Sequence, residues 1–148
     1  MKDLQTLLAE ATKLNQEIGR ILKASTFSDY NDLSELDIDT RDGEQIFLRD
    51  QLYHIMDKLA DAQSCIEYLN LPIGTITRLH RNGYGQYETT EGDCLYCGYP
   101  LEALISDEYH AVPYWARTRI EHNGTDYYLV KHKDTPLDGL TVRMRTRD

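Results

Sequence analysis

The stretch that decides the fold is ARTRIEHNGTDYYLVKH, residues 116–132. Apolar and polar residues alternate on both sides of Asn123 and Gly124, the pair that type I′ turns prefer. The pattern predicts a β-hairpin in which Ile120 faces Tyr127. The side expected to be buried carries Ile120, Tyr127 and Leu129, and the opposite side carries Arg119 and Tyr128.

Two further stretches of the C-terminal half show the same period of two. GTITRLH (74–80) and QYETT (86–90) flank the turn sequence RNGYG, which predicts another hairpin. GLTVRMRTR (139–147) predicts a last strand that alternates between apolar residues and arginines. Its apolar side holds Leu140, Val142 and Met144, and its other side holds Arg143, Arg145 and Arg147.

A small β-domain follows from these strands. The segment YPLEALIS (99–106) is expected to cover one mouth of that domain as a short helix or loop. Five or six short strands must curl to bury one face. We therefore predict a small antiparallel, SH3-like β-barrel or sheet over residues 71–148.

The N-terminal half has the period of helices. Small or apolar residues recur at alternating spacings of three and four over residues 4–25 and again over residues 48–69. Two such helices should form an antiparallel hairpin over residues 1–70, with the two seams packed against each other. The predicted fold class is therefore α+β. The first seam is Leu4, Leu7, Ala11, Leu14, Ile18, Ile21 and Ser25, and the second is Leu48, Leu52, Ile55, Leu59, Ala62, Ile66 and Leu69.

The chain has 148 residues and a net charge of −9, and its acidity lies mainly in the N-terminal half. Residues 1–70 carry 7 basic and 14 acidic side chains, whereas residues 71–148 carry 9 and 11. This charge disfavours direct binding to DNA or to an anionic membrane, and it favours a protein partner with a basic, nucleic-acid-binding surface. No apolar run approaches a membrane span, and the charged N-terminus does not resemble a signal peptide. Three cysteines imply no disulfide framework, so we expect a cytoplasmic protein.

The connector between the two predicted helices is strongly acidic. Between residues 29 and 44 it holds seven acids and one base, Arg41. Such a density of carboxylates imitates a phosphate strand and fits a basic groove. A solvated loop is the plainer alternative, and it stays open. The connector residues predicted to contact a partner are Asp29, Asp32, Glu35, Asp37 and Asp39.

The stretch EGDCLYCGYP, residues 91–100, holds two of the three cysteines. Two thiols at this spacing converge on one ion only if the chain turns between them, and Gly98 permits the positive φ of such a turn. This is the chemistry of half a zinc site. The ligands predicted for a structural zinc are Cys94, Cys97, His110 and His80. Two alternatives stay open: small packed residues beside a tight turn, with Cys97 buried, and a redox pair.

The C-terminal half resembles a small bacterial domain of unknown function that is common on phages and integrative elements. The likeness covers residues 74–145 and is carried by CGYPLEALI (97–105), Trp115, TRIEHNGTDYYLV (118–130) and GLTVR (139–143). It implies a β-domain in a mobile-element setting and no catalytic residues. The whole chain also looks like phage-encoded anti-CRISPR proteins, which share its small size, its acidity and a helical arm.

No nucleophile, phosphate-loop or metalloprotease motif occurs in the sequence, so we expect a binding protein and not an enzyme. The β-half is rich in aromatic residues, of which Trp115 and Tyr128 are predicted as partner contacts. The function predicted first is an anti-CRISPR protein that inhibits a type II effector nuclease by stoichiometric binding. The alternatives are a structural or regulatory phage protein that self-associates through its helices, and a small nucleic-acid-binding module that uses the arginines of the last strand.

Overall fold

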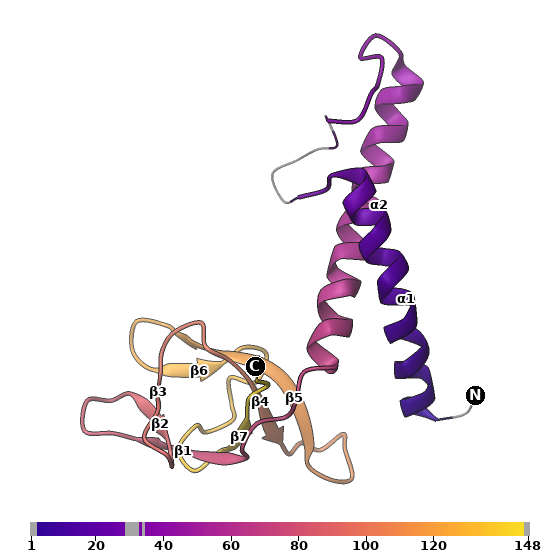
Figure 1. Ribbon diagram of the computed structural model, residues 1–148. Helices are drawn as coiled ribbons and strands as arrows, with labels where there is room; N and C mark the ends of the chain where they lie inside the picture. The colour runs from indigo at the N-terminus through magenta and orange to yellow at the C-terminus, as the bar shows by residue number, and fades with distance from the viewer. Residues whose placement is uncertain (1–2, 29–32, 34, 147–148) are drawn as a thin grey trace. The chain divides into compact units, whose positions relative to one another are not determined.

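The computed structural model describes residues 3–28, 33 and 35–146 (Figure 1). The chain divides into two compact units, a helical unit that ends at Leu71 and a β unit that begins at Pro72. The predicted α+β class is confirmed. Neither helix of the described chain is long and apolar enough to cross a membrane.

The helical unit is the antiparallel hairpin that the sequence predicts. Its helices are α1 (Leu4–Ser25) and α2 (Gly43–Leu69). Aspartates cap both N-termini: Asp3 accepts a hydrogen bond from the backbone N–H of Thr6, and Asp42 accepts one from Glu44. At one end of the pair, the side-chain amide of Asn70 donates to Thr12 Oγ1 at 3.0 Å. At the other end, the rings of Phe27 and Tyr53 lie 5.5 Å apart, which fixes the antiparallel order.

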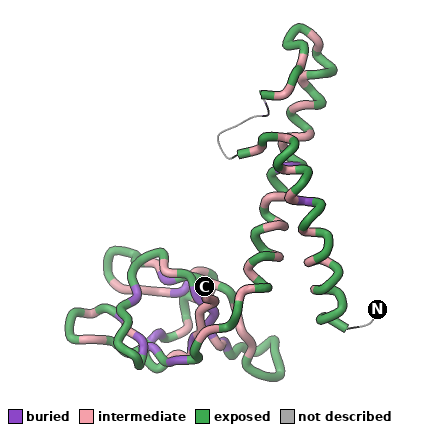
Figure 2. The backbone as a smooth tube through the Cα atoms, in the orientation of Figure 1, coloured by how far each residue is buried: buried purple, intermediate pink, exposed green. Residues whose placement is uncertain are grey.

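The prediction that the two seams seal each other is wrong for half of their residues. The hairpin buries Ile18 of α1 and Met56 of α2. On α1, Leu8, Asn15 and Leu22 are less exposed than the predicted seam residues Leu7, Leu14 and Ile21. Both helices therefore keep long exposed stretches, as Figure 2 shows in green. The exposed seam residues are Leu4, Leu7, Leu14, Ile21, Leu48, Ile55 and Leu69.

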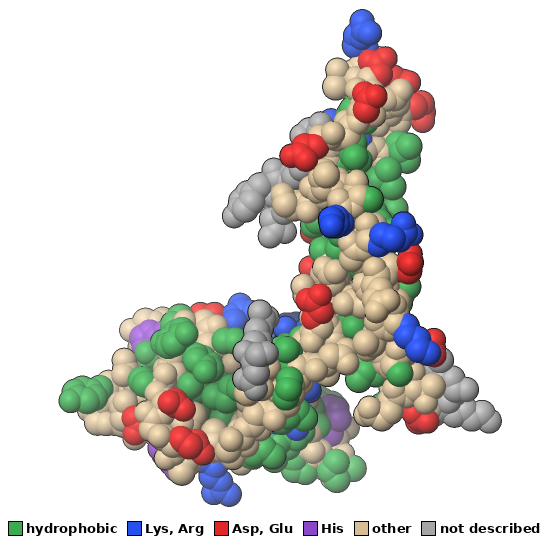
Figure 3. Space-filling view, viewed as in Figure 1, with side chains coloured by type: hydrophobic (Ala, Val, Ile, Leu, Met, Phe, Trp, Pro, Cys, Tyr) green, Lys and Arg blue, Asp and Glu red, His purple; other side chains and the backbone are tan. Residues whose placement is uncertain are grey.

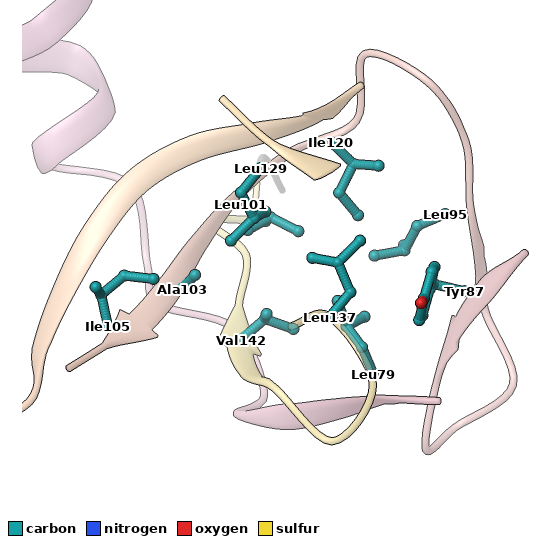
Figure 4. Close-up of a cluster of buried hydrophobic side chains, with 10 residues drawn as sticks. All are labelled: Leu79, Tyr87, Leu95, Leu101, Ala103, Ile105, Ile120, Leu129, Leu137 and Val142. Carbon is teal, nitrogen blue, oxygen red and sulfur yellow. The ribbon is translucent and has the colours of Figure 1, made fainter. Parts of the chain in front are cut away.

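The β unit is one antiparallel sheet of seven strands over the described residues, where the sequence predicts five or six. The strand order is β3-β2-β1-β7-β4-β5-β6, and the sheet curls strongly into a half-barrel (Figure 4). The strands are β1 (Thr77–Arg81), β2 (Tyr87–Thr89), β3 (Cys94–Leu95), β4 (Pro100–Ile105), β5 (Tyr114–His122), β6 (Tyr127–Leu129) and β7 (Thr141–Arg143).

The core lies inside this curl. Figure 4 shows side chains from all seven strands, and from the segment before β7, pointing into one cluster. Alternate residues of each strand reach it, because side chains of a strand point to opposite sides in turn. The buried cluster consists of Leu79, Tyr87, Leu95, Leu101, Ala103, Ile105, Ile120, Leu129, Leu137 and Val142.

The β5–β6 hairpin is confirmed, but the register predicted for it is wrong by two residues. Ile120 lies opposite Leu129, not Tyr127. The reason is a longer loop, in which Asn123 Oδ1 accepts hydrogen bonds from the backbone N–H groups of Thr125 and Asp126. A shift of two residues keeps every side chain on its predicted side, so the buried face is correct.

The strand β4 stands where the sequence predicts a short helix or loop, and that prediction is wrong. Leu101 and Ala103 point into the core, and the intervening Glu102 is also buried, on the outer side. A strand that is buried on both sides shows no apolar–polar alternation. In addition, Leu, Glu and Ala are strong helix formers, so this segment looks helical out of context.

We expect Gly74→Ala to destabilise the β unit. A Cβ at this position would lie 2.8 Å from the carbonyl oxygen of Met144, the same oxygen that accepts the Gly74 N–H at 2.7 Å. Since neither backbone can give way cheaply, the free energy of unfolding should fall by about 1–3 kcal/mol. Urea unfolding measures it. The matched control is Gly83→Ala, whose Cβ would meet nothing within 4 Å. Equal losses for both variants would contradict the steric argument.

Candidate nucleic-acid interface

The outer side of the half-barrel is a surface rich in arginine. Where one residue of a strand enters the core, its neighbours point outward. We call this surface the arginine face. Its outward residues are Arg78 and His80 of β1, Glu88 of β2, Cys94 of β3, Arg143 of β7 and Arg145 beyond it, Glu102 and Leu104 of β4, Trp115, Arg117, Arg119 and Glu121 of β5, and Tyr128 of β6.

Charge is strongly segregated onto the arginine face. The face carries five arginines and three glutamates, a net of +2. Residues 71–148 as a whole carry 9 basic and 11 acidic side chains, a net of −2. The rest of the β unit is therefore acidic, and an anionic ligand would be drawn to this one surface.

Glu102 organises the centre of the arginine face. Its two carboxylate oxygens accept hydrogen bonds from Arg143 Nε at 2.7 Å and Arg145 Nε at 2.8 Å. The side chain of Glu102 is 5% exposed, and those of the two arginines are 15% and 12% exposed. Arg117 lies directly opposite Glu102 on β5. A carboxylate removed from water needs such donors, because its desolvation is otherwise uncompensated.

Two aromatic rings lie beside these charges. The guanidinium carbon of Arg143 lies 4.1 Å from the centre of the Trp115 ring, which is a cation–π contact. Tyr128 follows on β6, opposite Glu121, and Lys133 Nζ lies 5.5 Å from the centre of its ring. Both rings are half-buried, so each keeps some surface for contact with a ligand.

The thiol of Cys97 lies at one edge of the arginine face, where it contacts Glu121. Cys97 Sγ donates to Glu121 Oε2 at 3.0 Å, while Arg119 Nε donates to Glu121 Oε1 at 2.7 Å. The bond to Glu121 raises the pKa of Cys97. The bonds from Cys97 and Arg119 lower the pKa of Glu121. Cys97 is therefore a protonated donor at neutral pH, whereas redox and metal chemistry need the thiolate.

The four predicted zinc ligands do not converge. Cys94 Sγ donates to Gln86 at 3.2 Å, and His80 Nε2 lies 3.3 Å from Thr90 Oγ1. His110 is held by Asp107 in the loop after β4. Within the described chain, no three His, Cys, Asp or Glu side chains come close enough to hold one ion.

The strand register nevertheless puts two of these ligands in one row. His80, Glu88 and Cys94 lie side by side across β1, β2 and β3. Among the described residues these side chains form no ready zinc site, and zinc stays a prediction. The turn beside Cys97 is as predicted, with Gly98 at φ +87°. The alternative of a buried Cys97 is wrong, since all three thiols are exposed.

The predicted partner contacts lie in two places. Trp115 and Tyr128 lie together on the arginine face. Among the connector residues, Glu35, Asp37 and Asp39 are exposed, and Asp39 accepts the backbone N–H of Arg41 at 2.9 Å. Asp29 and Asp32 lie outside the described residues.

Glu102 and Arg117 are site residues that the sequence did not predict. What identifies these two residues is their place in the sheet, which depends on the strand order. Because β4 pairs with both β5 and β7, Glu102 lies between Arg117 and Arg143. Arg147, predicted to share the face of Arg143 and Arg145, lies outside the described residues.

Comparison with known proteins agrees with the resemblance of the C-terminal half. No curated protein and no solved structure matches the chain. Residues 74–144 match the family model described as a domain of unknown function, DUF5348. This range spans all seven strands of the sheet. The half-barrel that presents the arginine face is thus a DUF5348 domain.

Proposed function

We propose that the β unit binds single-stranded nucleic acid through the arginine face. The observation that carries the proposal is the grouping of five arginines with Trp115 and Tyr128 on one side of an otherwise acidic unit. Arginines provide the phosphate contacts that dominate nucleic-acid affinity. Aromatic rings provide stacking surfaces for bases, and this pairing of features is typical of single-strand binding.

The arginines divide into two roles. Arg143 and Arg145 are held by Glu102 and are almost covered, so they support the face and the Trp115 ring. Arg78, Arg117 and Arg119 are exposed around this centre, where phosphates can reach their guanidinium groups, and Arg119 is at the same time paired with Glu121. The stacked bases of a duplex present no free ring faces to Trp115 and Tyr128, and a single strand is therefore favoured.

The anti-CRISPR hypothesis stays a prediction of the sequence. The acidic connector would supply its contact with a basic nuclease channel, and Glu35 and Asp37 are exposed there. Trp115 and Tyr128, by contrast, lie among arginines, which suits an anionic ligand better than a basic protein. Stoichiometric inhibition of a type II effector nuclease by this protein would favour the anti-CRISPR hypothesis over nucleic-acid binding.

The test is a fluorescence-anisotropy titration of the full chain with labelled oligo(dT) and oligo(U) at several salt concentrations. Arg78→Ala should weaken binding about tenfold, the value of one charged hydrogen bond. It should also lower the slope of log K against log salt by about one phosphate contact. The matched control is Arg81→Ala on the same strand, because Arg81 points away from the arginine face and pairs with Asp126 at 3.7 Å.

Three results would contradict the proposal. They are no salt-dependent binding of either oligonucleotide, equal losses for Arg78→Ala and Arg81→Ala, and equal affinity for duplex and single strand. Quenching of Trp115, the one tryptophan of the chain, gives an independent readout of a base at the face.

A further inference from the structure

The helical unit leaves two rows of large apolar side chains exposed. Each row has a spacing of seven or a multiple of seven, so its members lie above one another on the helix surface. Figure 3 shows hydrophobic surface along this unit. The row on α1 is Leu7 (54% exposed), Leu14 (56%) and Ile21 (37%), and the row on α2 is Leu48 (56%), Ile55 (49%) and Leu69 (48%).

Both rows lie on the same side of the hairpin. At about 100° per residue, Leu14 is turned about 40° back from the buried Ile18, and Ile55 is turned about 100° back from the buried Met56. The two turns have the same sense when each helix is seen from its own N-terminus. Because α1 and α2 are antiparallel, turns of the same sense bring both rows to one surface. We call these six residues the helical face.

We infer that two copies of the chain pair through the helical face. A repeat of seven is the repeat with which helices pack on helices, so the fitting partner is another pair of helices with that repeat. A second copy supplies it, with the same surface on both sides of a two-fold axis. The inference does not depend on the proposed binding of nucleic acid.

The charges of the two helices favour this pairing. α1 carries three bases and two acids, a net of +1, whereas α2 carries two bases and five acids, a net of −3. In a four-helix arrangement each α1 can lie against α2 of the other copy, and opposite net charges then face each other. Within α1, Glu10 pairs with Lys13 at 3.3 Å and Glu17 with Arg20 at 2.7 Å, so the net positive charge of this helix comes from Lys23.

The size of the helical face is adequate for a dimer. From Leu48 to Leu69 it is about 32 Å long, at about 1.5 Å per residue. The row on α1, from Leu7 to Ile21, is about 21 Å long, so two helices of about 10 Å diameter offer roughly 530 Å² per copy. Two copies then bury roughly 1,060 Å², just above the roughly 1,000 Å² expected of a biological interface.

The test is analytical ultracentrifugation of the full chain over a range of concentrations. Wild-type protein should sediment at twice the chain mass of 17.2 kDa and dissociate on dilution. Leu14→Lys places a charge in the helical face and should give a monomer. The matched control is Gln16→Lys, an exposed position about 200° round the helix from Leu14, and it should stay dimeric.

Circular dichroism separates loss of pairing from loss of folding. If Leu14→Lys loses helix content, Ile55→Lys tests the same face from α2. Wild-type protein that is monomeric at every concentration would overturn the inference, and so would a trimer or larger assembly. Folded Leu14→Lys and Ile55→Lys variants that both stay dimeric would place the interface elsewhere and overturn it too.

Discussion

Replacing Glu102 by alanine should lower the free energy of unfolding of the β unit by about 3–5 kcal/mol, the usual cost of removing one partner from a buried ion pair. Arg143 and Arg145 lose the carboxylate that accepts both of their Nε–H groups, and they remain almost covered. Urea unfolding followed by Trp115 emission measures the loss. The same probe reports on the folded cluster, since Arg143 stacks on the Trp115 ring.

The control for Glu102→Ala is Glu121→Ala. The Arg119–Glu121 pair has the same 2.7 Å separation, but its side chains are 55% and 26% exposed. Glu121 also accepts the Cys97 thiol, but both bonds lie in a partly exposed site, so Glu121→Ala should cost no more than about 1 kcal/mol. If the two variants lose similar stability, burial is not what makes the Glu102 cluster important.

Replacing Leu79 by alanine should cost the β unit about 2–5 kcal/mol, the range for large-to-small changes in a packed core. Leu79 is fully buried at the middle of β1, which pairs with β2 on one side and β7 on the other. The cavity would therefore open inside the curl of the sheet, where neighbours on both sides are fixed by strand pairing. Urea unfolding should show a lower midpoint with an unchanged slope.

Ile76→Ala is the comparison for Leu79→Ala. Ile76 lies three residues earlier and is 57% exposed, so its truncation should change the free energy of unfolding by no more than about 0.5 kcal/mol. A large loss at Ile76 would mean that this side chain is covered in solution, for example by another molecule.

Local pattern was enough to predict most of the secondary structure. The seams over residues 4–25 and 48–69 correspond to α1 and α2, and the turn residues around Gly83 and Gly124 mark two real hairpins. Local pattern failed where burial is decided by the rest of the fold. The strand β4 is central and covered on both sides, and its sequence therefore lacks the alternation that reveals a half-exposed strand.

The failure to predict β4 also explains why only part of the candidate site was predictable. The alternation of the last strand separates Arg143 and Arg145 from the core, and the hairpin pattern puts Arg119 and Tyr128 on one side. Joining these two groups requires β4 between them, since Glu102 is 41 and 43 positions away from its two arginine partners. Sequence spacing carries no signal for a contact made by strand order.

The short strand β7 has a consequence for how the β unit is made in the cell. It joins two sets of three strands, β3-β2-β1 and β4-β5-β6, each of which is continuous along the chain. During translation both sets are synthesised before Thr141–Val142–Arg143. Until β7 is made, the backbone hydrogen-bonding groups along one edge of β1 and one edge of β4 therefore have no partner strand. Completion of the sheet is therefore a late step that follows the emergence of β7 from the ribosome. A slow, long-range closing step of this kind exposes newly made chains to aggregation and to capture by chaperones.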